Sequence, residues 1–124
     1  MTESLGQKGE RLVEKKYLAD GFRLLERNYI LPFGKQTGEL DLIFAGQQEI
    51  VFVEVKTRTN ERFGSAVESV DYFKQRKLIR TAKLYMQQHS KFRDWNYRID
   101  VATVDIDNPA NPVIILVNAI EDLD

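Results

Sequence analysis

Apolar residues recur with a helical period near the start of the chain. Across residues 5–20 the apolar side chains fall on one arc at about 100° per residue. That arc contains Leu5, Leu12, Val13 and Tyr17. Ser4 and Gln7 have the spacing of a capping box, and Gly21 follows as a stop signal. The pattern predicts a first helix with Glu10 at the border of its apolar arc, so that the carboxylate is held against the edge of the core.

A second helical pattern covers residues 70–88. Its apolar face contains Leu78, Ile79, Ala82, Tyr85 and Met86. Its opposite face contains Arg76, Arg80 and Lys83. An amphipathic helix with a basic outer face is therefore expected here.

Five segments have the composition of β-strands. They are residues 22–30, ending before Pro32-Phe33-Gly34, and residues 38–45, 49–57, 97–106 and 113–119. In the second segment Leu40, Leu42 and Phe44 are expected on one face and Glu39, Asp41 and Ile43 on the other. In the third, Val51, Val53 and Val55 share one face and Ile50, Phe52, Glu54 and Lys56 the other. The link Gly46-Gln47-Gln48 between these two segments predicts a hairpin turn.

The element order α-β-β-β-α-β-β indicates an α/β fold, a sandwich in which helices flank a mixed central sheet. The hairpin strands should be antiparallel, and the helical crossover should place a later strand parallel to its predecessor. A chain of 124 residues suits one domain, expected to span residues 1–124.

Composition narrows the possible classes of protein. With 43% hydrophobic and 30% charged residues, the mixture is that of an ordinary water-soluble domain. The absence of cysteine excludes a disulfide framework, a thiolate zinc site and a cysteine nucleophile. No apolar run approaches the roughly 20 residues of a membrane span, and the polar N-terminus lacks the core of a signal peptide. We therefore expect a cytoplasmic protein that does not enter a membrane.

The net charge of −1 is uninformative, but its distribution is uneven. From Lys56 to Arg98 there are eleven basic and four acidic residues, whereas from Glu39 to Val55 there are four acidic residues and no basic one. A basic segment beside an acidic one suits a protein that holds a polyanion near a bound cation. Two solvated helical faces and an acidic tail explain the same distribution, and charge alone favours this second explanation.

The candidate chemistry lies on the hairpin strands. Glu54 and Lys56 project from the same face of one strand, and Asp41 lies on its neighbour, where it can come alongside Glu54. Two adjacent carboxylates repel each other unless a cation neutralises them, and divalent Mg²⁺ or Mn²⁺ prefers oxygen ligands. The triplet therefore predicts a metal site in which Asp41 and Glu54 bind the ion. Lys56 would orient the attacking water and stabilise charge on a phosphate.

Two further groups are candidates for the metal, the backbone carbonyl of Val55 and the carboxylate of Glu10. The acid-x-lysine pattern by itself is weak, since Glu14-Lys15-Lys16 repeats it inside the first helix. On these residues alone, a catalytic site and a structural ion pair explain Glu54 and Lys56 equally well.

Other polar residues could surround such a site. Glu39 and Gln75 are candidates for groups that support the ligands, although Gln75 would equally serve to satisfy loose backbone. Candidates for contact with a nucleic-acid backbone are Arg58, Lys74, Arg76, Lys77 and Arg80. For His89 a contact at the helix C-terminus is expected, for Asp100 a bond to a neighbouring strand, and for Trp95 and Tyr97 packing at the core.

Two stretches of the chain resemble the hallmark motifs of the YraN family of small bacterial proteins. They are Gly38-Glu39-Leu40-Asp41-Leu42-Ile43 and Val51-Phe52-Val53-Glu54-Val55-Lys56-Thr57-Arg58. Shorter matches are Gly6-Gln7-Lys8-Gly9-Glu10, Glu26-Arg27-Asn28-Tyr29, Lys74-Gln75-Arg76-Lys77-Leu78 and Arg98-Ile99-Asp100-Val101. That family is placed with the restriction-endonuclease-like nucleases of the PD-(D/E)xK type, and the arrangement is also similar to archaeal Holliday-junction resolvases.

The resemblance implies a restriction-endonuclease-like fold and a Mg²⁺- or Mn²⁺-dependent endonuclease acting on DNA, including branched or structured DNA. It maps Glu10, Asp41, Glu54 and Lys56 onto metal and catalytic positions; in one departure from the wider motif, no proline precedes Asp41. The alternatives are a nucleic-acid-binding module without turnover and a protein-interaction domain. The oligomeric state stays open, although a homodimer suits an enzyme that cuts both strands.

Overall fold

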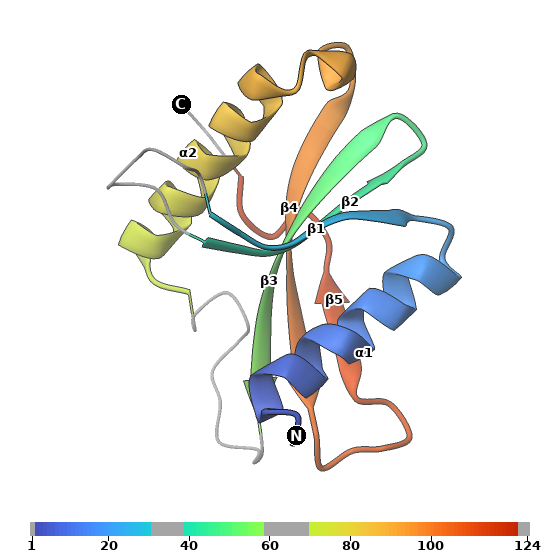
Figure 1. Ribbon diagram of the computed structural model, residues 1–124. Helices are drawn as coiled ribbons and strands as arrows, with labels where there is room; N and C mark the ends of the chain where they lie inside the picture. Colours follow the sequence, from blue (N-terminus) through green and yellow to red (C-terminus); the bar gives the residue numbers. More distant parts are fainter. Residues whose placement is uncertain (1, 31–38, 59–69, 122–124) are drawn as a thin grey trace.

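A five-stranded mixed sheet forms the centre of the molecule, with one helix packed against each face (Figure 1). The computed structural model describes residues 2–30, 39–58 and 70–121. In chain order the elements are α1 (Leu5–Ala19), β1 (Arg23–Ile30), β2 (Glu39–Gly46), β3 (Glu49–Arg58), α2 (Tyr72–Gln88), a 3₁₀ turn (Ser90–Phe92), β4 (Asn96–Asp105) and β5 (Val113–Leu116). The predicted α/β class and element order are confirmed.

The strands lie in sequence order across the sheet. β1, β2 and β3 form antiparallel pairs, β3 pairs with β4 in parallel, and β5 closes the edge antiparallel to β4. α2 lies between β3 and β4 in the chain and provides the crossover that parallel neighbours need. The predicted hairpin turn is present between β2 and β3, where Gln47 and Gln48 both have positive φ angles, of 53° and 60°.

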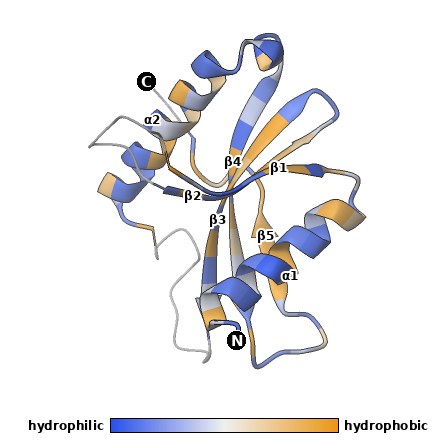
Figure 2. Cartoon of the chain, in the orientation of Figure 1, coloured by the Kyte–Doolittle hydropathy of each residue, from blue (hydrophilic) through white to orange (hydrophobic). Residues whose placement is uncertain are grey.

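Each face of the sheet has its own hydrophobic cluster. The cluster under α2 includes Ile43, Ile50, Phe52, Leu78 and Tyr85. The cluster under α1 includes Val13, Tyr17, Phe44, Val51 and Val53. Figure 2 shows hydrophobic residues interspersed with hydrophilic ones along the strands and both helices. Both faces of the sheet are therefore covered, which explains the nearly continuous apolar runs of β2 and β3.

One predicted orientation was wrong. Leu40 was expected beside Leu42 and Phe44, but it packs in the cluster under α2. The pairing of β2 with β3 reaches only Leu42, while β2 continues along β1 to Glu39. The alternation of the paired region therefore does not extend to Leu40.

The helix ends follow local capping. The predicted capping box of α1 is present, with Gln7 N donating to Ser4 Oγ at 3.1 Å and Ser4 N donating to Gln7 Oε1 at 2.9 Å. α2 begins at Tyr72, two residues later than predicted, because the side chain of Asp71 accepts from Lys74 N at 2.8 Å. Neither described helix has the length and hydrophobicity needed to cross a membrane. The predicted strand end at Pro32-Phe33-Gly34 lies outside the described residues.

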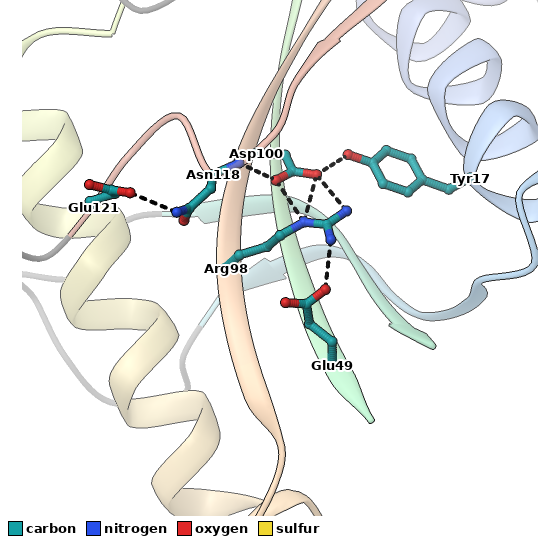
Figure 3. Close-up of polar contacts among 6 residues, drawn as sticks. All are labelled: Tyr17, Glu49, Arg98, Asp100, Asn118 and Glu121. Atoms are coloured by element: carbon teal, nitrogen blue, oxygen red, sulfur yellow. Dashed lines mark hydrogen bonds and ion pairs between the residues drawn. The ribbon is translucent and has the colours of Figure 1, made fainter. Parts of the chain in front are cut away.

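Asp100, a fully buried carboxylate on β4, joins four parts of the chain (Figure 3). It accepts hydrogen bonds from Tyr17 Oη on α1 at 2.6 Å, from Arg98 Nε at 3.0 Å and from Asn118 N at 2.8 Å. Arg98 Nη1 in turn donates to Glu49 Oε1 at 2.6 Å, at the start of β3. The bond was expected to reach a neighbouring strand; instead Asp100 bonds to α1, to its own strand and to the segment after β5, and both of its oxygens have partners.

Candidate functional site

The two predicted acids meet where β2 and β3 separate. The last paired residues at this end of the hairpin are Leu42 and Val53. Asp41 and Glu54 are the next residues beyond this pair, and they are close enough for the charge of Glu54 to act on Asp41. The hairpin therefore brings the two carboxylates together, as the sequence predicted.

Asp41 also takes over a backbone role at this point. Its Oδ2 accepts a hydrogen bond from Val55 N at 2.7 Å. In a continued ladder this amide would face the β2 backbone, so the carboxylate serves as its acceptor where the ladder stops. The bond fixes the Asp41 side chain against β3, next to Glu54.

The environment of Asp41 disfavours its ionised form. Burial and the negative charge of Glu54 raise the pKa of Asp41 to about 7, although the hydrogen bond from Val55 N acts in the opposite direction. Two carboxylates placed side by side with little solvent are costly unless a positive charge is shared between them.

Glu54 is the more deeply buried acid, with 4% of its surface exposed. Its Oε1 forms an ion pair with Lys74 Nζ of α2 at 2.9 Å. Among the described residues no donor reaches the other oxygen, Oε2, although it is buried. Asp100, the other deeply buried carboxylate, has partners for both oxygens. A buried carboxylate oxygen without a partner is unusual, and at Glu54 it faces a site rich in charge.

Two ammonium groups lie beside the acids. Lys56 is half-buried on β3, where burial and the neighbouring Lys74 lower its pKa. For Lys74, burial also lowers the pKa, but the hydrogen bond and charge of Glu54 outweigh it, so that the pKa is raised. The site therefore contains two like charges in close proximity, which is favourable only around an anion.

α1 reaches the same region from the opposite face of the sheet. Gly9 is buried against Thr57 of β3, and a Cβ atom at Gly9 would overlap the Thr57 side chain. The next residue, Glu10, is half-buried, and burial, the charge of Glu39 and the charge of Glu54 raise its pKa. Glu10 also acts on Asp41 through its charge. The predicted helix glutamate is thus within electrostatic range of both acids.

The comparison with known proteins identifies the family. The model of the uncharacterised protein family UPF0102 matches residues 9–104, a span that contains Glu10, Asp41, Glu54, Lys56 and Lys74. The chain belongs to the UPF0102 family. The expected YraN resemblance is thereby confirmed.

Relatives match over most of their length. The UPF0102 protein of Vibrio parahaemolyticus is 42% identical over 100 residues, covering 81% of this chain and 79% of its own. That of Stutzerimonas stutzeri is 37% identical over 120 residues, covering 97% of each chain. The protein of Caldanaerobacter subterraneus subsp. tengcongensis is 36% identical over 118 residues, covering 95% of this chain and 92% of its own.

The donors of this UPF0102 site fit a hard divalent cation. Within residues 2–30, 39–58 and 70–121, no three acidic or histidine side chains are gathered tightly enough to enclose an ion by themselves. Asp41 and Glu54 provide two adjacent carboxylates, and one buried oxygen of Glu54 has no partner. Mg²⁺ commonly takes one or two carboxylates and completes its shell with water and substrate oxygens. The set suits such an open site better than a closed protein cage.

The remaining candidates lie around this centre. Arg58 is half-buried at the end of β3, and Lys77 is exposed on α2 with Arg80 one turn further. Arg76 is half-buried on the same helix. Glu39 is exposed at the start of β2 and lines a groove together with Lys74 and Lys77. Of these candidates, Glu39 and Lys77 share the groove that Lys74 lines, and the others lie on β3 and α2.

The structure shows the contacts of four further residues whose roles were predicted from the sequence. Gln75 Nε2 donates to the carbonyl of Val70 at 2.8 Å, so it satisfies backbone at the start of α2. His89 caps α2, with Nδ1 2.7 Å from the carbonyl of Tyr85, as expected. Trp95 and Tyr97 pack against the core cluster under α2, also as expected.

Sequence reasoning missed the position of Lys74. It was predicted to contact a nucleic-acid backbone, which stays a prediction, while its ammonium group is ion-paired with Glu54, a contact that the sequence did not predict. The only signal for this is its place in the first turn of a helix that packs on the face of Glu54. Periodicity cannot show how far a flexible lysine reaches.

Proposed function

We propose that this UPF0102 protein hydrolyses phosphodiester bonds in nucleic acid, with DNA as the expected substrate, using a divalent cation. One observation carries the proposal: Asp41 and Glu54 are crowded together in a largely buried position, with two lysines beside them, and one oxygen of Glu54 has no partner among the residues that the structure describes. A structural ion pair would need only one acid and one base. This site contains a second carboxylate and a second lysine. The extra carboxylate suits a bound cation, and the extra lysine suits a bound phosphate.

Each residue has a definable role in this proposal. Asp41 and Glu54, with the carbonyl of Val55 and the charge of Glu10, would hold Mg²⁺ or Mn²⁺. When bound, such an ion polarises a phosphate oxygen and lowers the pKa of coordinated water. Asp41 is held in place by the amide of Val55, so its orientation does not depend on the ligand.

Lys56 would contact the attacking water and the phosphate. Burial and the neighbouring Lys74 lower its pKa, and its position two residues from Glu54 places it on the same side of β3. A positive group there stabilises the negative charge that accumulates on the phosphate oxygens during hydrolysis. Arg58, Arg76, Lys77 and Arg80 would hold the nucleic-acid backbone.

The test compares wild type with Asp41→Asn, Glu54→Gln and Lys56→Met on end-labelled linear duplex, single-stranded and four-way junction DNA. Reactions contain Mg²⁺, Mn²⁺ or EDTA. We expect cleavage that requires the ion and falls by at least about a hundredfold in each variant, the scale of losing one group that stabilises the transition state. Asp94→Asn is the matched control, since this exposed acid lies outside the site.

Cleavage that persists in all three variants or in EDTA would contradict the proposal. DNA binding without cleavage under every condition would support the non-catalytic binding module instead. Failure to bind any nucleic acid, together with a stable protein partner, would support the interaction domain.

A further inference from the structure

We propose that Lys74 is an internal cation of the site, which holds Glu54 in the ion-free protein, releases it when a divalent ion binds, and then contacts the phosphate. The inference rests on the proposed function and assigns a residue that lies outside the hairpin motif. In the ion-free state Lys74 is a positioning residue; with substrate bound it is part of the catalytic set.

The start of α2 fixes the backbone from which Lys74 reaches the site. The amide of Lys74 donates to the Asp71 cap at 2.8 Å, so this residue lies in the first helical turn. From there its side chain crosses to β3, where Nζ is 2.9 Å from Oε1 of Glu54. The bond therefore connects the crossover helix to the central strand.

The two side chains of this ion pair differ in how much of their surface is exposed to solvent. The Glu54 side chain is 5% exposed, whereas that of Lys74 is 41% exposed. Lys74 also lines a groove of about 330 Å³ together with Glu39, Asp71, Phe73, Lys77 and Leu78. Glu54 must stay in place, but Lys74 has solvent and open space into which its four-carbon stem can rotate.

The neighbouring lysine argues against a purely structural role. Lys56 projects from the strand of Glu54 and interacts with its charge, so a second positive charge already lies near the acid. Lys74 adds a second ammonium group next to Lys56, and the two repel each other. Keeping both is favourable when an additional anion enters, and the phosphate of the proposed substrate is such an anion.

A divalent ion would compete directly with Lys74. Both seek the oxygens of Glu54, and the ion carries twice the charge and can use Asp41 as well. Only one ammonium group needs to leave, and Lys74 is the one that is ion-paired with Glu54 through a side chain that is 41% exposed. Its departure would place a positive charge at the mouth of the site, beside Lys77.

The experiment measures Mn²⁺ binding by isothermal titration calorimetry in the absence of nucleic acid. Wild type is compared with Lys74→Met, Lys74→Arg and the control Lys77→Met, which changes an exposed lysine of the same groove. We expect Lys74→Met to bind Mn²⁺ roughly fivefold more tightly, the shift for removing one partly exposed competing ion pair. Lys77→Met should leave the affinity within about twofold.

DNA cleavage should change in the opposite direction. For Lys74→Met we expect kcat to fall at least about tenfold despite tighter ion binding, because a positive charge at the phosphate is lost. Lys74→Arg should recover part of the rate. Tighter metal binding combined with slower turnover is not expected from a merely structural lysine, whose loss would weaken both.

Unchanged or weaker Mn²⁺ binding in Lys74→Met would overturn the inference, and so would a wild-type protein that binds no Mn²⁺. Thermal unfolding shows whether each variant is folded; if Lys74→Met is not, Lys74→Gln takes its place under the same criteria. If wild type binds Mn²⁺ but cleaves no substrate, the proposed function fails. The Mn²⁺ affinities of wild type and Lys74→Met still show whether Lys74 competes with the ion for Glu54.

Discussion

Asp41 combines a structural bond with an unfavourable charge. It accepts the Val55 amide that the ladder leaves without a partner, and it lies against Glu54 in a mostly buried position. The first contact supports the ionised form, whereas burial and Glu54 oppose it. Because burial and Glu54 prevail, the ion-free protein is expected to hold a proton at this site at mildly acidic pH.

This proton predicts a pH dependence of stability. The folded protein releases it near a pKa of about 7, whereas the ordinary value is 3.8. Between these values the folded state binds more protons than the unfolded state, so the free energy of unfolding falls as pH rises. In EDTA, urea unfolding should show a slope of up to about 1.4 kcal/mol per pH unit that Asp41→Asn reduces. Equal slopes for wild type and the variant would contradict the assignment.

Gly9 provides a second prediction at this scale. Replacing a helical glycine with alanine usually stabilises a helix by about 0.5–1 kcal/mol. At Gly9 a methyl group would overlap Thr57 and push α1 away from β3, so we expect a net loss of about 1–3 kcal/mol and slower cleavage.

Gly6 is the matched control for this change. It is exposed in the same helix, and the nearest atom to a Cβ there is Ser4 Oγ at 4.0 Å. Gly6→Ala should therefore keep or raise the unfolding midpoint in urea. If both variants are equally stable, the close contact between Gly9 and Thr57 does not limit the position of α1.

At the scale of helices and strands, local patterns predicted most of the fold. The capping box located α1, the alternation of residues 49–57 located β3, and the helix between two strands predicted their parallel pairing. The failures occur where tertiary contacts override a pattern. Leu40 turns toward α2 because β2 leaves β3 at Leu42, and a short 3₁₀ turn at Ser90–Phe92 has no periodicity to predict it.

In the candidate site, too, some contacts could be predicted from the sequence and others could not. The pairing of Asp41 with Glu54 follows from hairpin register, which a sequence can predict. The ion pair between Lys74 and Glu54 depends on how far a lysine side chain reaches from α2 to β3. A sequence pattern does not predict that reach. The position of Glu10 depends on how closely α1 docks, and that is set by the contact of Gly9 with Thr57.

α2 carries a prediction about nucleic-acid binding. If its basic residues contact phosphates, binding in EDTA should weaken steeply between about 50 and 200 mM salt. Lys77→Ala and Arg80→Ala should each reduce the slope of log K against log salt by about one. Lys15→Ala, an exposed lysine on α1, is the control. Fluorescence anisotropy with a labelled duplex measures these slopes, and a flat salt dependence of wild type would exclude α2 as the contact.

At the scale of the whole molecule, the hydrogen-bond network around Asp100 connects α1 to the central sheet. It links α1, the start of β3, β4 and the segment after β5 through one buried carboxylate (Figure 3). Tyr17→Phe removes one charge-assisted hydrogen bond from it, and we expect a loss of about 1.5–3 kcal/mol in unfolding free energy. Metal-dependent cleavage at low temperature should be retained, because the site does not use this hydroxyl.

Tyr72→Phe is the control for that substitution, since Tyr72 is 67% exposed. Its unfolding midpoint should match that of wild type. A Tyr17→Phe protein as stable as wild type would show that the remaining partners of Asp100 satisfy it without the hydroxyl.

The central place of β3 also bears on how activity appears during folding. Its hairpin with β2 is local in the chain and can form early, whereas its pairing with β4 must wait for the distant crossover to close. A nascent chain that has only the hairpin would possess both acids but neither the docked α2 nor its lysine. If the proposed function is correct, hydrolysis would then become possible only once this non-local step has brought Lys74 to the two acids.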